Sequence, residues 1–252
     1  MIGKLLRFIV GIFIVLFFIS KDPTLQGYVD SSVEQIKNTV AFHSPITAEE
    51  VPPYSGNISV QMNDNIPYFS DEVYLVNPAS AFEYYGNLDS LGRCTGAEAN
   101  VGKELTPKEK DREDISEVKP SGWWNKPYDF IDNGGYLYNR CHLIAYMLTG
   151  ENANEKNLIT GTRYFNTQGM LPYEIQVFDY VNRTGNHVLY RVIPVFKGNN
   201  LVADGVLMEA YSLEDNGQGL QFCVFVYNVQ PGVTIDYADG NNWESGYSEG
   251  EN

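Results

Sequence analysis

Three β-rich runs follow one another closely in the C-terminal half of the chain, and they restrict the fold more than any other feature. The runs span His187–Phe196, Leu201–Tyr211 and Leu220–Val229, and short polar turns at 197–200 and 215–219 separate them. Neighbouring strands joined by such short turns pair in antiparallel order, because a parallel pair needs a crossover of about a dozen residues or more. We therefore expect an antiparallel sheet at the centre of the fold.

A helical pattern precedes these strands. Between Pro172 and Thr184, apolar side chains recur at Ile175, Phe178 and Val181, and proline suits the first turn of a helix. Strands combined with flanking helices place the chain in the α+β class. The length of 252 residues and the hydrophobic fraction of 43% allow one large packed domain with appendages, or two small ones, and exclude a mainly disordered or collagen-like protein.

The first twenty residues, 1–20, have the pattern of an export signal. Lys4 and Arg7 precede an unbroken apolar run from Phe8 to Ile19, and a basic stretch followed by an apolar one is typical of such signals. Because the run ends without a good cleavage site, the pattern favours an uncleaved hydrophobic helix that anchors the chain in the membrane, with its basic end in the cytoplasm and the bulk outside the cell. A cleaved signal peptide and a secreted protein are the alternative.

The rest of the chain divides by composition. Residues 21–57 hold a short amphipathic pattern at Tyr28–His43, followed by a proline-containing stretch without apolar periodicity, which predicts a helical stalk and then a linker. We expect the folded domain at 58–237. Residues 238–252 are polar and acidic, which predicts a disordered tail.

Charge is distributed unevenly along the chain. There are 17 basic against 32 acidic residues, giving a net charge of −15, which on its own argues against binding to nucleic acid. Residues 93–163 are nearly neutral, however, with 10 basic and 11 acidic side chains. This stretch could present either a local basic face or a solvated surface of mixed sign.

Cysteine and histidine are scarce in this chain. Three cysteines without a CxxC pair exclude a zinc ribbon and a dense disulfide framework, but they leave open one bridge with a spare thiol. Of three histidines, His142 has the richest neighbourhood, a β-like stretch from Tyr136 to Ile144. Cys141 directly precedes it, but adjacent side chains of a strand point to opposite faces, which argues against a thiol-protease pair.

Three segments around His142 form a recognisable pattern: Asn139–Leu143, Asn157–Asn166 and Gly169–Glu174. Together they resemble the DNA/RNA non-specific endonucleases, a family of ββα-metal (His-Me finger) nucleases, and most closely its streptodornase-like branch of secreted or membrane-anchored enzymes. The resemblance extends over about 90–233, more than half of the chain. It implies a ββα-metal core on a central antiparallel sheet with flanking helices, and hydrolysis that leaves 5′-phosphate products.

The resemblance assigns His142 as the general base, because a neutral imidazole accepts the proton of an attacking water near neutral pH. It assigns Asn166 as the ligand of Mg²⁺, which needs few protein ligands and for which Mn²⁺ can substitute. It makes Glu174 the carboxylate that holds the waters of the metal. Structural roles are also open to two of them: Asn166 could cap the helix that follows it, and Glu174 could interact with a helix dipole.

Two arginines and a second asparagine complete the implied site. Arg140 and Arg163 are candidates for phosphate contacts through their forked donors, and Asn157 is a candidate for orienting the site. Here, too, structural roles compete, because Asn157 could form a turn and Arg163 could pair with a surface acid.

One departure from the family separates two hypotheses about function. The family signature is Asp-Arg-Gly-His, and Asn139 and Cys141 here replace the Asp and the Gly, so one charge is lost and one side chain is larger. The first hypothesis is an Mg²⁺-dependent endonuclease outside the cell that cuts DNA, with RNA as a second substrate, without sequence preference. The alternative is a catalytically inactive, membrane-anchored receptor for nucleic acid whose altered signature has lost turnover. The net charge favours either this receptor or a site reached through a local basic groove. Metal-dependent cleavage of a plasmid distinguishes the two.

Overall fold

The structure is a computed structural model, and it describes residues 42–69, 80–108, 112–131 and 135–246. The expected hydrophobic helix at 1–20 and nearly all of the expected stalk lie outside the described residues. Within the described part, no helix is both long and apolar enough to span a bilayer.

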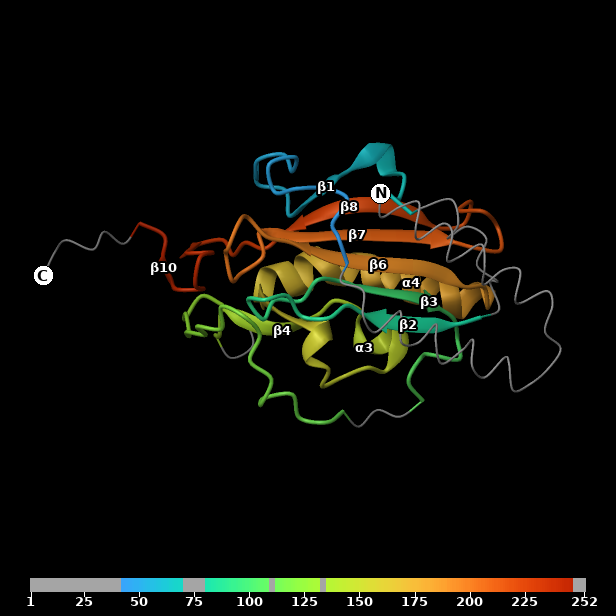
Figure 1. The fold of residues 1–252 in the computed structure, drawn as a ribbon, viewed down its shortest axis with the longest axis horizontal. Coiled ribbons are helices and arrows are strands. Elements are labelled where there is room, and N and C mark those ends of the chain that lie inside the picture. Colours follow the sequence, from blue (N-terminus) through green and yellow to red (C-terminus); the bar gives the residue numbers. More distant parts are fainter. Residues whose placement is uncertain (1–41, 70–79, 109–111, 132–134, 247–252) are drawn as a thin grey trace, which may run out of the picture. The chain divides into compact units, whose positions relative to one another are not determined.

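A six-stranded sheet forms the centre of the described fold (Figure 1). Its strands lie in the order β1-β8-β7-β6-β3-β2, and every neighbouring pair is antiparallel. The bounds are β1 Ser59–Gln61, β2 Phe82–Tyr85, β3 Ala97–Val101, β6 Val188–Val195, β7 Gly205–Ser212 and β8 Gln221–Tyr227. The three adjacent strands β6, β7 and β8 are the three β-rich runs of the sequence, so the expected antiparallel order is confirmed.

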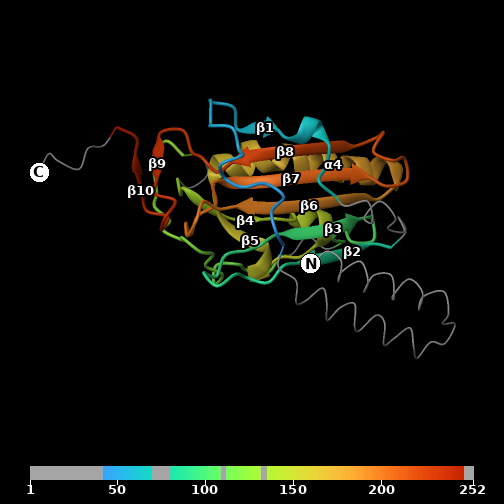
Figure 2. The same cartoon turned by 45° about the horizontal axis from the view of Figure 1, so that its top comes forward.

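Helix α4 (Leu171–Thr184) covers one face of this sheet and shares a hydrophobic core with it (Figures 1 and 2). The helix itself is the predicted one, and of the expected stripe Val181 is buried and Phe178 packs against the core, but Ile175 does not face it. Ile175 is 42% exposed, whereas Glu174, Val177 and Val181 are buried. These three follow the helical spacing i, i+3, i+7, and one of them is a carboxyl that a search for apolar periodicity passes over.

Residues 42–58, which precede the edge strand β1, lie over the other face of the sheet, although a linker was expected there. Ile46 is buried in a cluster that includes Leu207 and Phe225 from the sheet. The hydroxyl of Tyr227 donates a hydrogen bond to the carbonyl oxygen of Pro52 at 2.6 Å. In Figure 2 this stretch passes in front of the strands while α4 lies behind them. A few well-placed contacts therefore fix a segment that has no periodic apolar pattern.

Residues 238–246, which were expected to belong to a disordered tail, are ordered in the structure. Strands β9 (Val233–Ile235) and β10 (Asn242–Glu244) pair in antiparallel order. Asn242 is 1% exposed, and its Oδ1 accepts a hydrogen bond from the Tyr128 hydroxyl at 2.7 Å. Long-range hydrogen bonds, rather than apolar burial, order this polar segment. Residues 247–252 lie outside the described part of the chain.

A separate hairpin next to the sheet carries the family signature. Strand β4 (Tyr138–His142) pairs antiparallel with β5 (Leu158–Thr162), and the chain then enters η4 (Phe165–Met170), a π-helical stretch that continues directly into α4. This succession of two strands and a helix is the expected ββα unit. Between the strands lie two short helices, α3 (Tyr146–Thr149) and η3 (Glu155–Asn157); a third, η1 (Asn63–Asn65), follows β1.

All three cysteines lie within the described residues, and all three are free and buried. The bridge that the cysteine count left open is therefore not formed in this structure.

Candidate active site

His142 is the last residue of β4 and lies opposite Leu158 of β5. Its ring nitrogen Nε2 lies 2.9 Å from the backbone carbonyl oxygen of Asn152. A carbonyl oxygen only accepts hydrogen bonds, so Nε2 carries the proton and donates it to Asn152. This assignment leaves Nδ1 as the unprotonated, basic nitrogen of the neutral ring.

The surroundings of His142 favour the neutral ring. Burial lowers the pKa of His142, because desolvation penalises the charged imidazolium, and the nearby positive charge of Arg112 lowers it further. The hydrogen bond to Asn152 opposes these effects without cancelling them. At neutral pH the ring is therefore unprotonated at Nδ1 and able to accept a proton.

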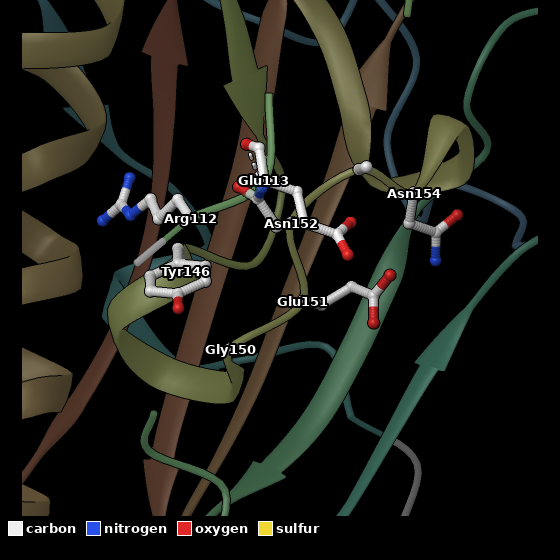
Figure 3. Close-up of a pocket in the computed structure, with 8 residues that line it drawn as sticks. Arg112, Glu113, Tyr146, Gly150, Glu151, Asn152 and Asn154 are labelled. Carbon is white, nitrogen blue, oxygen red and sulfur yellow. Dashed lines mark hydrogen bonds between the residues drawn. The ribbon is translucent and has the colours of Figure 1, made fainter. Parts of the chain in front are cut away.

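Asn152 holds the ring of His142, a role that no residue pattern indicates. It follows α3 in the loop 150–154, and its own side-chain Nδ2 donates to the carbonyl oxygen of Glu113 at 2.7 Å (Figure 3). The residue is buried, so both bonds lie largely away from water. A backbone carbonyl is supplied by every residue type, and for that reason a residue pattern cannot identify this contact.

Asn157 lies in the interior and fixes the turn that follows β4. Its Oδ1 accepts a hydrogen bond from the backbone N–H of Ile144 at 2.8 Å, and its Nδ2 donates to the carbonyl oxygen of Ile144 at 3.0 Å. Its own carbonyl oxygen accepts from the N–H of Leu143 at 2.8 Å. The side chain is fully buried, so it positions the backbone next to His142 instead of reaching a substrate.

Cys141 fits the hairpin because the facing strand carries a glycine. A Cβ atom added to Gly161 would lie 2.5 Å from the Sγ of Cys141, so the two positions share one space. The thiol is buried, and this burial raises its pKa well above the usual value. The cysteine is therefore a packing residue with an inert thiol, as the strand geometry predicted.

Asn166 is the second residue of η4 and is partly exposed. Within the described part of the chain, its side-chain amide has no hydrogen-bonding partner. The helix start is instead capped by Thr162, whose Oγ1 accepts from the N–H of Phe165 at 3.0 Å. Asn166 therefore does not cap the helix, and its amide oxygen is available to a ligand.

Glu174 lies on the buried face of α4, with 6% of its surface exposed. Burial raises the pKa of its carboxyl to about 8, and its charge contributes to the raised pKa values of Cys141 and Tyr190. No other described residue donates a hydrogen bond to this carboxyl. Eight residues separate it from Asn166, close to two turns of the joined π- and α-helical stretch, which places the two on one side of that helix.

These two residues are the oxygen donors that a divalent cation would use. Mg²⁺ prefers hard oxygen ligands and retains several waters, so one amide oxygen with one nearby carboxyl suits it. A buried carboxyl without a hydrogen-bonding partner is costly, and a nearby cation or its water would relieve that cost. The residues present thus fit the expected metal.

The two candidate arginines differ in how they are engaged. Arg140 donates from Nη2 to the carbonyl oxygen of Ser116 at 2.6 Å, and its guanidinium lies 4.4 Å from the centre of the Trp123 ring. It therefore supports the loop beside the hairpin. The guanidinium of Arg163 has no hydrogen-bonding partner in the described part of the chain and lines an open pocket.

Comparison with known protein families identifies the family of this ββα unit. The sequence profile of the DNA/RNA non-specific endonucleases matches residues 75–213, which is more than half of the chain. The chain belongs to the DNA/RNA non-specific endonuclease family. The family resemblance found in the sequence is thereby confirmed.

Relatives of this endonuclease domain are streptococcal nucleases. A deoxyribonuclease of Streptococcus dysgalactiae subsp. equisimilis is 28% identical over 196 residues, which are 62% of this chain and 59% of the relative. The chain thus spans less than two thirds of the length of that curated relative. The relatives support the streptodornase-like branch.

Solved structures agree on the endonuclease fold. NucA from Streptococcus agalactiae, solved with a magnesium ion bound, has a TM-score of 0.63 at 27% identity, over 73% of this chain and 85% of NucA. The Sda1 nuclease, solved with a zinc ion bound, has a TM-score of 0.55 at 28% identity, over 65% of this chain and 82% of Sda1. The expected α+β class is confirmed.

Proposed function

We propose that this chain is a metal-dependent endonuclease that hydrolyses the phosphodiester bonds of DNA, and also of RNA, without sequence preference. The observation that carries the proposal is the ring of His142, which the Asn152 carbonyl orients so that a neutral, basic Nδ1 remains. The ββα unit also presents Asn166, whose amide has no hydrogen-bonding partner in the described part of the chain. Family membership and the streptococcal nuclease relatives support the same activity.

The residues divide the chemistry among them. His142 removes a proton from the attacking water at Nδ1, and the hydrogen bond from Nε2 to Asn152 stabilises the imidazolium that forms. Asn166 would hold a divalent cation through its amide oxygen, and Glu174 would support the waters of that cation. When bound, Mg²⁺, or Mn²⁺ in its place, supplies a Lewis acid that stabilises negative charge on the phosphate and on the leaving 3′ oxygen. The products then carry 5′ phosphates.

Two further residues act through position and charge. Arg163, whose guanidinium has no hydrogen-bonding partner among the described residues, contacts a phosphate of the substrate. Arg140 holds the loop at 116–123 beside the hairpin. A contact between Arg140 and a phosphate of the substrate would be a second role, in addition to this support.

We also propose that the enzyme acts outside the cell, attached to the membrane by its first twenty residues. The support is the basic and apolar pattern of residues 1–20 together with its poor cleavage site. Mass spectrometry of the mature protein tests this. An intact N-terminus in the membrane fraction supports an anchor, whereas an N-terminus after about residue 20, with activity in the medium, contradicts it.

Conversion of supercoiled plasmid by the purified full chain tests the proposed activity. We expect nicking with Mg²⁺ that chelation abolishes, and loss of that activity in Asn166→Ala. Asn182→Ala is the matched control, because Asn182 is an exposed asparagine on α4 whose amide bonds only to its own helix. Plasmid binding without any metal-dependent cleavage would overturn the proposal in favour of the inactive receptor.

A further inference from the structure

The pocket that Arg163 lines opens at the start of η4, the helical stretch that also carries Asn166. It has a volume of about 400 Å³. Its lining combines one cation, two aromatic rings, one aliphatic side chain and three neutral polar side chains: Arg163, Phe130, Tyr164, Ile131, Thr167, Gln168 and Gln230. Among the described residues that line the pocket, none carries a carboxylate.

Hydrogen bonds fix the walls of this pocket in place. The backbone N–H of Tyr164 donates to Oε1 of Gln230 at 3.0 Å, and that of Arg163 donates to the carbonyl oxygen of Leu137 at 2.8 Å. Thr167 Oγ1 donates to the carbonyl oxygen of Arg163 at 2.9 Å. The pocket is therefore formed before any ligand enters.

Phe130 contributes an aromatic ring to the lining of this pocket. It is 50% exposed, although its ring centre lies 5.6 Å from that of Tyr128 and its edge lies against Gly232. These contacts hold the ring while half of its surface stays open. A half-exposed aromatic ring in one pocket with a guanidinium that no described residue engages is a combination with which proteins bind single-stranded nucleic acid.

The pocket shown in Figure 3 differs from the pocket of Arg163 in the charges of its lining residues. Glu113 and Glu151 line it, and the raised pKa of Glu151 reflects first its burial and then the nearby charge of Glu83. The guanidinium of Arg112 there already lies 4.1 Å from the centre of the Tyr146 ring. Carboxylates repel phosphate, so of these two pockets the one with Arg163 suits a nucleotide.

We propose that the pocket of Arg163 and Phe130 binds one nucleotide of a single-stranded segment next to the bond that is cut. Arg163 binds the phosphate of that nucleotide, and the base stacks on Phe130. In a duplex the faces of each base are covered by its neighbours, so stacking on Phe130 requires a free or unstacked strand. The pocket therefore gives the enzyme a preference for single strands. This inference rests on the proposed nuclease function, because it names the substrate of the same site.

Fluorescence anisotropy with a labelled oligo(dT) and a labelled duplex of equal length tests the proposal, in chelator so that cleavage does not interfere. We expect the parent to bind the single strand more tightly. Phe130→Ala lowers affinity for oligo(dT) roughly 5- to 150-fold, the range for loss of one base–aromatic stack, and lowers duplex affinity much less. Phe130→Tyr should retain the single-strand preference of the parent, because it keeps an aromatic ring at this position.

Two matched controls show whether the effect is local. Tyr54→Ala removes an exposed aromatic on the segment that covers the other face of the sheet, and Arg183→Ala removes a cation from the last turn of α4. Both should bind oligo(dT) as the parent does, whereas Arg163→Ala should bind it more weakly. If Phe130→Ala does not fold, Phe130→Leu takes its place, because leucine keeps apolar packing against Gly232 without the aromatic face.

The outcomes separate this proposal from the proposed function. Equal losses for single strand and duplex in Phe130→Ala, or no loss for either, would overturn the subsite while leaving metal-dependent cleavage intact. A ring-dependent preference for oligo(dT) in a protein that never cleaves would support the subsite and overturn the nuclease.

Discussion

Replacing Asn157 by alanine tests how the fold positions His142. The side chain makes two hydrogen bonds to the backbone of Ile144, one to its N–H and one to its carbonyl oxygen. Both residues are fully buried, so water cannot replace these bonds. Each unsatisfied buried backbone group costs about 1–3 kcal/mol, so we expect Asn157→Ala to lower the free energy of unfolding by about 2–6 kcal/mol.

The same substitution should slow catalysis in the molecules that remain folded. The turn at Leu143–Ile144 directly follows His142, and a displacement of about 1 Å at a reacting group can cost about 100-fold in rate. We expect the turnover of Asn157→Ala to fall by about 10- to 100-fold, measured well below its melting temperature.

Urea unfolding followed by circular dichroism measures the stability change. Asn154→Ala is the matched control, because Asn154 caps η3 through a single bond to the N–H of Lys156 at 3.0 Å, which predicts a loss of only about 1 kcal/mol. If Asn157→Ala loses less than the control, or keeps the parent turnover, the positioning role of Asn157 is refuted.

Three further predictions concern pH and metal. Glu174→Gln should stabilise the metal-free protein at pH 7 by about 3 kcal/mol, because burial raises the pKa of the carboxyl from 4.5 to about 8 and the parent loses stability as the pH rises between these values. Urea titrations in chelator from pH 5 to 8 check this, and a parent whose stability stays constant would contradict it. Asn166→Ala should lose metal-dependent turnover while Asn166→Asp keeps metal binding with an altered pH dependence; unchanged apparent metal affinity in the alanine variant would assign the ion to another residue. Burial lowers the pKa of His187, but hydrogen bonds to Glu104 and Glu214 outweigh this effect and raise the pKa. The charged cluster therefore stabilises the fold at pH 6 and loses that contribution as the pH rises through the raised pKa. The melting temperatures of the parent and of His187→Gln should differ more at pH 6 than at pH 8.5.

Much of the fold follows from local pattern. Strands β6 to β8 and helix α4 could be predicted because short polar turns and proline mark their ends. The order around Asn242 and the packing of Ile46 could not, because hydrogen bonds and contacts with residues far along the chain create them. Glu174 was expected near the metal, but its burial was not, since apolar periodicity does not report a buried carboxyl.

The candidate site shows the same division between local and distant information. His142, Asn157 and Asn166 could be named because the segments that carry them resemble a known family, and their roles in this chain stay predictions. The partner that orients His142 is the carbonyl of Asn152, ten residues away in a loop, and any residue could supply it. The space that accommodates Cys141 depends on Gly161 of the facing strand, which becomes meaningful only once the hairpin register is known.

The central claim is that His142 is the general base of a metal-dependent nuclease, and imidazole rescue tests it most directly. Plasmid cleavage with Mg²⁺ is measured for the parent, for His142→Ala and for His43→Ala, which replaces an exposed histidine outside the site. We expect His142→Ala to be about 10²- to 10⁴-fold slower with an unchanged melting temperature, added imidazole to restore part of the rate, and His43→Ala to match the parent. Cleavage by His142→Ala at the parent rate would contradict the account.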